Sequence, residues 1–499
     1  MGKKLLLGYD IGSSSIKASF IDVETGEVVA SSSSPGSEMK IDSPKLGLAE
    51  QHPENWWHHT VIATKKILET ISLNSHKVLA IGISYQMHGL VMVDKNYDVL
   101  YPSIIWCDSR AVEIGNKAFA DLGAEYCLSH YLNSPGNFTA SKLKWVKDNL
   151  PEIFSKVYKI MLPGDYIALK LTGQVYTTIS GLSEGILWDF KGFTIAEKLL
   201  EYYNLDKNLI ADQVPNFGIQ GKLTAEAAVT LGLKSGIPIT YRAGDQPNNA
   251  LSLNVMNPGE IAATAGTSGV IYGIGKNNIY DSENRVNTFA HVNYTKKQPN
   301  VGVLLCINGT GIQYNWLKQN ILDDKYSYNE LNTFASQIEI GSNGLTCFPF
   351  GNGAERIFNN KELFCQFSGI NFNVHSKAHM IRAAQEGIIF SFRYGVDVMK
   401  KMGIEFKVVR AGNSNLFQSP IFRKAFVNTC NVKLEIYNAD GSQGAARGAG
   451  IGVGAFSLKD AFIGLKVVKE LVPDEESLNA YKSVYQNWEN ILQNNLKNF

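Results

Sequence analysis

Apolar and polar positions near the start of the chain occur in short blocks that predict strands. Residues 4–8 form an apolar run that ends at Asp10, which predicts a buried strand. A glycine and three serines then form a turn, and residues 15–21 predict a second strand. Thr25-Gly26 is a hairpin signal that returns residues 28–33 as a third strand. Residues 78–84 predict a further short strand, which runs into Gln86.

Helical spacing of apolar side chains appears in three segments. Residues 54–71 and 139–149 fit a helical period, and residues 378–402 form a long helical pattern that Gly403 closes. Ser419 can cap another helix, with Pro420 at its first position. Two more strands are predicted, at residues 237–241 and 406–410. Regular structure is therefore expected in both halves of the chain.

One short pattern occurs twice. Residues 12–16 (Gly-Ser-Ser-Ser-Ile) parallel residues 266–270 (Gly-Thr-Ser-Gly-Val), and in both places a small-polar turn joins two apolar strands. A single match of this length is weak evidence for a repeat, but the second copy lies near the middle of the chain. A chain of 499 residues suggests two large domains or three small ones. Because no long Pro- or Ser-rich linker is present, we expect the domains to pack closely.

Composition narrows the class of protein. Apolar residues make up 44% of the chain, the formal net charge is +1, and no Lys/Arg-rich run occurs, so neither nucleic acid nor an anionic membrane is favoured as a partner. None of the six cysteines lies in a C-x-x-C pair, which favours reduced thiols over a zinc or redox site. The first apolar run is too short for a signal-peptide core, and no stretch reaches the length of a membrane span. We expect a soluble cytoplasmic protein.

Three glycine-containing turns follow apolar strands and are candidates for anion binding. They lie at residues 10–15, 265–269 and 411–415. Glycine lets the backbone approach a ligand, and the N–H groups of a turn can form a nest for an anion. Each turn alone is more typical of an ordinary loop, but three in one chain suggest a polyphosphate ligand. No P-loop motif and no G-x-G-x-x-G run after a strand is present.

Two aspartates follow predicted strands. Asp10 borders the first turn, where a carboxylate beside a phosphate nest requires a cation, so we expect a Mg²⁺ site that Asp10 holds through water, or else a turn-capping residue. Asp245 lies between Gly244 and Gln246, and a base beside an amide donor suits deprotonation of a hydroxyl. An ordinary turn residue is the alternative for Asp245.

Polar side chains also follow the strand predicted at residues 78–84. Gln86 and His88 can donate to sugar hydroxyls, and Met87 supplies an apolar wall. Taken alone, a histidine in this position is more often a partly buried structural residue. A glycosidase would also need carboxylates in a cleft, but it would not need three anion-binding turns.

Together these residues resemble the FGGY family of carbohydrate kinases, and within it the xylulokinase subgroup. The resemblance runs in order from the first strand to about residue 460. It rests on residues 10–14 (DIGSS), 86–90 (QMHGL), 105–110 (IWCDSR), 138–145 (FTASKLKW), 162–166 (LPGDY), 171–173 (LTG), 243–246 (AGDQ), 266–268 (GTS) and 379–386 (HMIRAAQE). The segment 86–110 is the match most specific to the subgroup. The family's adenosine loop is usually rich in glycine and alanine, whereas this chain has Ala-Gly-Asn-Ser-Asn at 411–415.

The resemblance implies two α/β domains of the actin-like ATPase (ribonuclease H-like) fold, each with a mixed central sheet, and a cleft between them. We expect a sugar-binding domain at residues 1–246 and a nucleotide-binding domain at residues 247–499. The implied reaction is D-xylulose + ATP → D-xylulose 5-phosphate + ADP, with Mg²⁺ organised by Asp10 and the proton accepted by Asp245. The implied sugar ligands are Gln86, Met87, His88, Asp245 and Gln246. The implied nucleotide ligands are Asp10, Gly12, Ser13, Ser14, Gly266, Thr267, Ser268, Gly309, Gly311, Gly412 and Asn413.

Other readings stay open at this point. The sugar could be ribulose, another ketose, gluconate or glycerol, and a nucleotide-binding protein of the same fold without sugar turnover is a further alternative. The sequence does not decide the oligomeric state, and a homodimer is among the alternatives.

Overall fold

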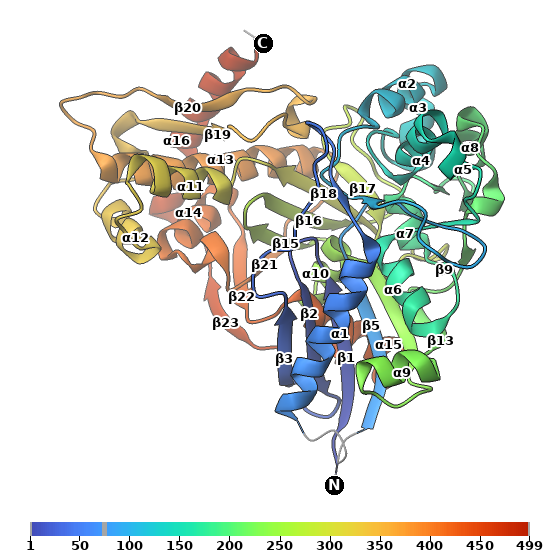
Figure 1. Ribbon diagram of the computed structural model, residues 1–499. Coiled ribbons are helices and arrows are strands. Elements are labelled where there is room, and N and C mark those ends of the chain that lie inside the picture. The colour runs from blue at the N-terminus through green and yellow to red at the C-terminus, as the bar shows by residue number, and fades with distance from the viewer. Residues whose placement is uncertain (1, 72–76, 498–499) are drawn as a thin grey trace.

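Two mixed β-sheets form the centre of the molecule (Figure 1). The structure is a computed structural model and describes residues 2–71 and 77–497. The first sheet has the strand order β13 (Phe217–Lys222), β14 (Pro238–Gly244), β5 (Lys77–Tyr85), β1 (Lys4–Ile11), β2 (Ile16–Asp22) and β3 (Val28–Ser34). The second has the order β17 (Asn287–Ala290), β18 (Val301–Ile307), β16 (Gly269–Gly275), β15 (Glu260–Ala265), β21 (Val408–Gly412), β22 (Lys433–Tyr437) and β23 (Val467–Leu471).

The two sheets repeat one pattern of strand directions. In the first, β1, β5 and β14 are parallel, while β2 and β13 run antiparallel to their neighbours. In the second, β15, β21 and β22 are parallel, while β16 and β23 run antiparallel. The turns at residues 12–15 and 266–268 occupy the same place, because each joins the first strand of its sheet to the antiparallel second strand. Two domains with mixed sheets, as the sequence predicts, are confirmed, whereas a boundary at residue 246 stays a prediction.

Two helices cross between the sheets. Helix α10 (Asp245–Ser252) follows β14 but places Ala250 in a hydrophobic cluster with residues of the second sheet. Helix α15 (Gly441–Gly452) follows β22 but packs on β1, β5 and β2 of the first sheet (Figure 1). The approach requires glycine, since a Cβ on Gly8 would lie 1.9 Å from the carbonyl oxygen of Ser442. The two helices also contact each other and so join the domains.

Further helices cover the sheets and form an additional lobe. In the first half they are α1 (Pro53–Thr70), α2 (Val112–Leu122), α3 (Ala124–Tyr131), α4 (Thr139–Asn149), α5 (Pro151–Phe154), α6 (Pro163–Thr172), α7 (Ile179–Glu184), α8 (Glu197–Tyr203) and α9 (Ala225–Leu231). In the second half they are α11 (Gly311–Trp316), α12 (Tyr328–Ser336), α13 (Lys377–Lys401), α14 (Pro420–Cys430) and α16 (Glu475–Lys497), beside the hairpin of β19 (Thr346–Phe350) and β20 (Phe364–Ser368). The helices predicted at 54–71, 139–149 and 378–402 are confirmed as α1, α4 and α13.

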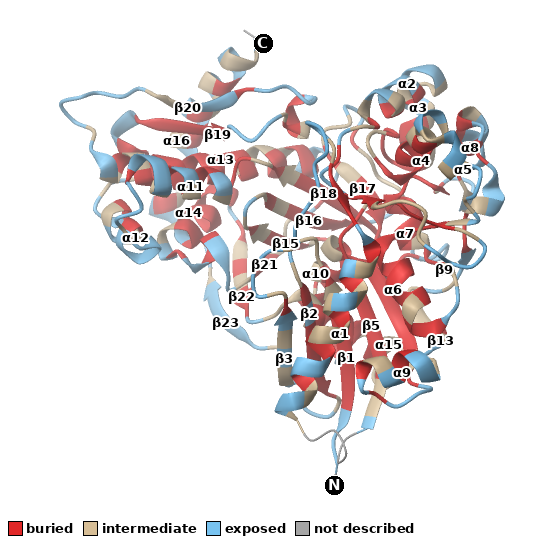
Figure 2. Cartoon of the chain, viewed as in Figure 1, coloured by how far each residue is buried: buried red, intermediate tan, exposed pale blue. Residues whose placement is uncertain are grey.

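Burial follows the predicted pattern. The central strands are buried and the outer helices expose their polar faces (Figure 2). The side chain of Ser419 caps α14 and Pro420 begins it, as predicted. All six cysteines are free thiols. Among the described residues, none of the helices combines the length and the apolar character needed to cross a membrane.

Candidate active site

Three parallel strands of the first sheet end at one edge and bring the predicted chemistry together. Asp10 lies near the end of β1, Gln86 follows β5, and Asp245 follows β14. Because β5 pairs with both β1 and β14, the three side chains come from adjacent strand ends. In open α/β sheets, ligands bind outside the carboxyl ends of the strands. This edge is therefore the candidate active site.

Asp245 is poised to exchange a proton near neutral pH. It opens α10, and the backbone N–H and side chain of Gln246 donate to its carboxylate. Burial, with a smaller contribution from the charge of Asp10, raises the pKa of Asp245 to about 7. The side chain nevertheless keeps intermediate exposure, so a ligand can reach it. A carboxylate in this condition can act as a general base.

Asp10 faces the start of α15. The hydroxyl of Ser84 donates to Oδ1 of Asp10 over 2.8 Å. A Cβ on Gly441 would lie 2.4 Å from Oδ2, so the helix start touches the carboxylate. Burial raises the pKa of Asp10, and the charge of Asp440 adds to the rise. Sequence reasoning missed Ser84, Asp440 and Gly441, because the last two lie more than 400 residues away along the chain.

Two buried amide oxygens without partners lie at this edge. Oε1 of Gln86 and Oε1 of Gln246 are buried and accept no hydrogen bond from the protein. Met87 packs against Gly244, where a Cβ would lie 2.5 Å from its Cγ and 3.1 Å from Oε2 of Glu184. Buried polar atoms are nearly always hydrogen-bonded, so a cluster of bare acceptors indicates a ligand that supplies donors. Glu184 was not among the residues singled out from sequence.

The first turn is only partly available to a ligand. The N–H of Gly12 donates to the carbonyl of Ser15 over 3.1 Å, and the carbonyl of Ser13 accepts from Gln51. The hydroxyl of Ser13 accepts from Nε1 of Trp106 over 3.3 Å. Ser14 is exposed. The N–H of Gly12 is therefore occupied, whereas the exposed Ser14 and the O–H of Ser13, which accepts from Trp106 but can still donate, remain for a phosphate.

A cavity of about 720 Å³ in the second domain joins the other two turns. The N–H of Gly311 donates to the carbonyl of Gly266 over 2.8 Å, and a Cβ on Gly311 would lie 2.2 Å from that oxygen. Such close backbone packing leaves room only for glycine at position 311. The lining residues are Ala265, Gly266, Thr267, Gly311, Ile312, Tyr314, Asn315, Tyr328, Asn329, Asn332, Ser414, Asn415, Leu416, Gln418 and Ser419.

Other predicted nucleotide ligands lie beside this cavity rather than in its lining. Ser268 ends the second turn, next to the lining residue Thr267. Gly412 and Asn413 precede the lining residue Ser414, and the N–H of Asn413 donates to the carbonyl of Tyr437 over 2.8 Å. Gly309, which was also predicted to bind the nucleotide, is not among the lining residues of this cavity. Its N–H donates to Glu355 over 3.1 Å, and a Cβ there would lie 1.6 Å from the carbonyl oxygen of Pro349.

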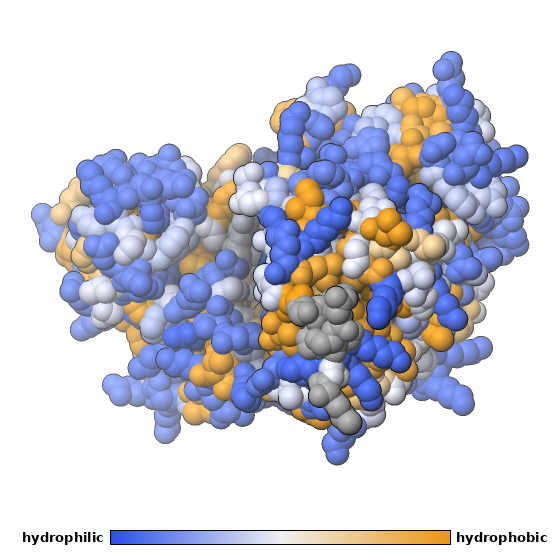
Figure 3. Space-filling model, turned by 60° about the horizontal axis from the view of Figure 1, so that its bottom comes forward, coloured by the Kyte–Doolittle hydropathy of each residue, from blue (hydrophilic) through white to orange (hydrophobic). Residues whose placement is uncertain are grey.

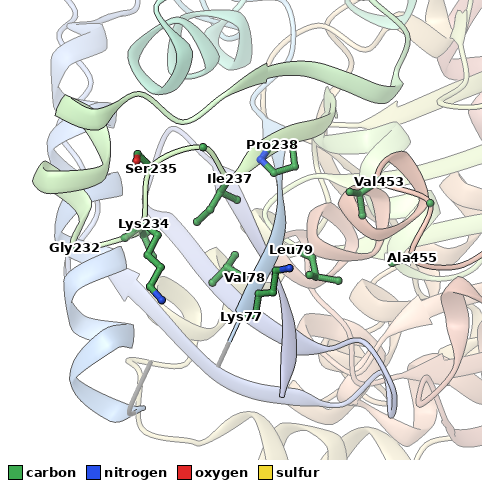
Figure 4. A pocket seen from close by; sticks show the side chains of 13 residues that line it. Lys77, Val78, Leu79, Gly232, Lys234, Ser235, Ile237, Pro238, Val453 and Ala455 are labelled. Carbon is green, nitrogen blue, oxygen red and sulfur yellow. The ribbon is translucent and has the colours of Figure 1, made fainter. Parts of the chain in front are cut away.

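A second cavity, of about 810 Å³, lies at the opposite end of the first sheet. It is formed by the start of β5, the loop before β14 and the residues that follow α15 (Figure 4). Figure 3 shows this face of the molecule, where apolar side chains gather. Among the residues that the structure describes, the lining includes Lys77, Lys234 and Ser235 but no carboxylate or histidine.

Comparison with known proteins decides the family. Residues 5–252 match the N-terminal domain of the FGGY family of carbohydrate kinases, and residues 261–455 match its C-terminal domain. The chain belongs to the FGGY family of carbohydrate kinases. It is accordingly an enzyme that transfers a phosphoryl group from ATP to a carbohydrate.

Relatives of this FGGY kinase cover nearly its whole length. The xylulose kinase of Lactococcus lactis is 29% identical over 505 residues, which span 98% of this chain and 96% of the relative. A ligand-bound xylulose kinase from Lactobacillus acidophilus has a TM-score of 0.89 at 23% identity and covers 98% of this chain and 97% of its own. A gluconate kinase from the same species has a TM-score of 0.88 at 22% identity and covers 99% of each chain. The predicted actin-like fold is confirmed.

Proposed function

We propose that this FGGY kinase phosphorylates D-xylulose with ATP to give D-xylulose 5-phosphate and ADP. The observation that carries the proposal is Asp245, a proton acceptor with a pKa of about 7 beside bare buried acceptors on the first domain. Relatives called xylulose kinase that match 98% of the chain support the choice of sugar. The two structural neighbours do not, because a xylulose kinase and a gluconate kinase share the fold equally well.

The sugar is held by the first domain. Gln86 and Gln246 each present an oxygen that accepts from a hydroxyl, and Met87 closes one wall. Asp245 accepts the proton of the attacking hydroxyl as the oxygen bonds to the γ-phosphorus and the bond to the β-phosphate oxygen breaks. Phosphoryl transfer depends mainly on such positioning and on neutralising charge. Closure of the domains would exclude water and limit hydrolysis of ATP.

The nucleotide is held by the second domain. The cavity beside Gly266 and Gly311 has room for the adenosine, with Asn415 and Leu416 in its wall. Thr267 and Ser268 supply N–H and hydroxyl donors to phosphate at the end of β15, while Ser13 and Ser14 do so at the end of β1. Two equivalent turns, one from each domain, thus bind the phosphates from opposite sides.

The carboxylates suit a magnesium ion carried with ATP. Burial raises the pKa of Asp10 and of Asp245. The charge of Asp440 adds to the rise at Asp10 and the charge of Asp10 adds to the rise at Asp245, so a cation at this edge is favoured. Within residues 2–71 and 77–497, no cluster of three metal-binding side chains occurs. Mg²⁺ commonly uses one or two carboxylates with waters and substrate phosphates, and Asp10, through water, fits that role. The ion would neutralise charge on the phosphates during transfer.

The bare atoms favour a neutral sugar over a sugar acid. A gluconate carboxylate needs donors, but Lys142 is bonded to the carbonyls of His88 and Ile105, and Arg356 is bonded to Asn284. The unpaired buried atoms next to Asp10 and Asp245 are instead the amide oxygens of Gln86 and Gln246, which match hydroxyl donors. This argument favours a ketose or polyol as the substrate. A cytoplasmic location and a homodimer stay predictions.

A panel of acceptors tests the proposal. Release of ADP is measured with D-xylulose, D-ribulose, D-gluconate and glycerol at a fixed ATP concentration. We expect D-xylulose to have the highest kcat/KM, at least about tenfold above gluconate, since a lost or mismatched polar contact in a buried site costs about one to three kcal/mol. A higher value for any other acceptor would remove D-xylulose as the substrate, and no turnover with all four would remove the proposed activity.

A further inference from the structure

The backbone of His88 adopts a conformation that its surroundings must enforce. Its φ is 61°, in the left-handed region that non-glycine residues adopt uncommonly, with asparagine, aspartate and histidine the most frequent among them. A non-glycine residue in this conformation persists where neighbouring contacts hold it, often at functional sites. His88 directly follows Gln86 and Met87 at the end of β5, on the sugar side of the active site.

Two buried charged residues supply those contacts. The N–H of His88 donates to Oε2 of Glu184 over 3.3 Å, and its Nδ1 lies 2.9 Å from the carbonyl oxygen of Glu184. Nζ of Lys142 donates to the carbonyl of His88 and to that of Ile105, each over 2.9 Å. Glu184 ends α7 and Lys142 lies in α4, so residues of two helices of the first domain hold the backbone of His88 through hydrogen bonds. The relative exposure of Lys142 is 0% and that of Glu184 is 1%.

These contacts decide which nitrogen of His88 is a donor. A carbonyl oxygen only accepts, so Nδ1 carries the hydrogen and Nε2 keeps its lone pair. Burial and the nearby Lys142 lower the pKa of His88 to about 3, which keeps the ring neutral. Phe138 and Phe289 lie against the ring, with centroids 4.8 Å and 5.3 Å away. The ring plane is thereby held, and Nε2 is an acceptor.

The charge states of the two supporting residues agree with this role. Burial lowers the pKa of Lys142 to about 7 and raises the pKa of Glu184 well above its usual value. Neither group needs a full charge to make the bonds described, because a neutral amine and a neutral carboxyl retain a donor and an acceptor. Oε2 of Glu184 also borders the wall formed by Met87 and Gly244, next to Asp245.

We propose that Glu184 and Lys142 are positioning residues that hold His88 in its left-handed conformation, with Nε2 as a hydrogen-bond acceptor for a hydroxyl of the sugar. This inference rests on the proposed function for the identity of the ligand. It adds a requirement on the substrate: the hydroxyl that faces His88 must be a donor. A keto or deoxy group at that carbon is rejected.

A double-mutant cycle tests whether Glu184 acts through His88. In Glu184→Ala, KM for the best sugar of the panel rises about tenfold, because one hydrogen bond that holds His88 is lost. KM for ATP stays within about twofold, and Glu184→Gln, which keeps an acceptor, recovers most of the loss. In a His88→Ala background the same Glu184→Ala change has no further effect on the sugar KM. If the rise in sugar KM in the double mutant equals the product of the rises in the two single mutants, the proposal is overturned.

Controls separate positioning from folding. Glu54→Ala removes a half-exposed carboxylate of the same domain that accepts from Lys170 over 2.9 Å, and it lowers Tm without changing the sugar KM. If Glu184→Ala does not fold, Lys142→Met, which keeps the volume of the side chain, takes its place in the cycle.

A second readout does not depend on turnover. In protein with ¹⁵N-labelled histidine, His88, assigned through His88→Ala, shows the tautomer with hydrogen on Nδ1. Hydrogen on Nε2 would overturn the inference even if D-xylulose is the substrate. Conversely, absence of sugar turnover with the expected tautomer would defeat the proposed function and leave the geometry of His88 standing.

Discussion

The chemistry of the site depends on one carboxyl group whose environment holds its pKa near neutrality. Asp245 receives donors from Gln246 that favour its charged form, but burial and the charge of Asp10 outweigh them and raise its pKa to about 7. An aspartate at its usual pKa would be a weaker base for a hydroxyl proton. The activity should therefore be sensitive to pH in a range where ordinary carboxyl groups do not titrate.

The pH profile of kcat/KM checks this directly. We expect kcat/KM for D-xylulose to fall about tenfold per pH unit below pH 7, since only the deprotonated form of Asp245 can accept the proton. Above pH 7, where Asp245 is already deprotonated, kcat/KM should not change with pH. A profile that stays level down to pH 5 would contradict the raised pKa.

Ionisation of Asp245 should also affect the stability of the fold, in the direction opposite to its effect on activity: it enables catalysis but destabilises the folded state. A carboxyl whose pKa is raised on folding penalises the folded state once it ionises, so the penalty is absent below about pH 4, grows between the unfolded and folded pKa values, and is complete above about pH 7. Asp245→Asn removes the penalty. Its gain in Tm over the unmodified chain should be larger at pH 8 than at pH 5, as measured by calorimetry, and an equal or smaller gain at pH 8 would count against the assignment.

Part of this site could be read from the sequence and part could not. Asp10, Gln86 and Asp245 each follow an apolar run, and side chains at strand ends can be recognised one at a time. Glu184 offers no such signal, because it ends a short helix in a region without a distinctive pattern. Its importance depends on a contact with His88, 96 residues away, which only the folded chain reveals.

At the scale of elements, the crossing of α15 onto the first sheet matters most for the site. The helix has glycine or alanine at eight of its twelve positions, GSQGAARGAGIG, which lets it approach β1 and β5 closely. Gly82 repeats the situation of Gly8, since a Cβ there would lie 2.0 Å from the carbonyl oxygen of Ala445. This packing places the start of α15 against Asp10. Sequence reasoning expected the helix region only as part of the second domain and could not foresee that it covers the first.

Gly441→Ala tests the contact between α15 and Asp10. The added Cβ would lie 2.4 Å from Oδ2 of Asp10, so the carboxylate must move. We expect kcat to fall about 10- to 100-fold, as misplacement by one ångström typically costs, and the Mg²⁺ concentration for half-maximal activity to rise. Gly36→Ala is the matched control, because a Cβ there meets nothing within 4 Å. Normal kcat and Mg²⁺ dependence in Gly441→Ala would show that the contact has no catalytic role.

At the scale of the whole molecule, two similar halves contribute different functions. Each has a mixed sheet, a small-polar turn after its first strand and a helix that crosses to the other half. The first half carries Asp10, Asp245 and the bare acceptors, and the second carries the cavity of about 720 Å³. The repeated turn at residues 12 and 266 hinted at this duplication. The crossing of α15 (Gly441–Gly452) could not be predicted, because this helix packs on β1 (Lys4–Ile11) and β5 (Lys77–Tyr85), which lie more than 350 residues earlier in the chain.

The most direct measurement is the turnover of Asp245→Asn with D-xylulose and ATP, set beside its affinity for ATP by calorimetry. Loss of a general base should lower kcat by about 100- to 10,000-fold, while Kd for ATP stays within about twofold because the nucleotide cavity lies in the other domain. Turnover within about threefold of the unmodified enzyme would contradict the assignment of Asp245 as the proton acceptor.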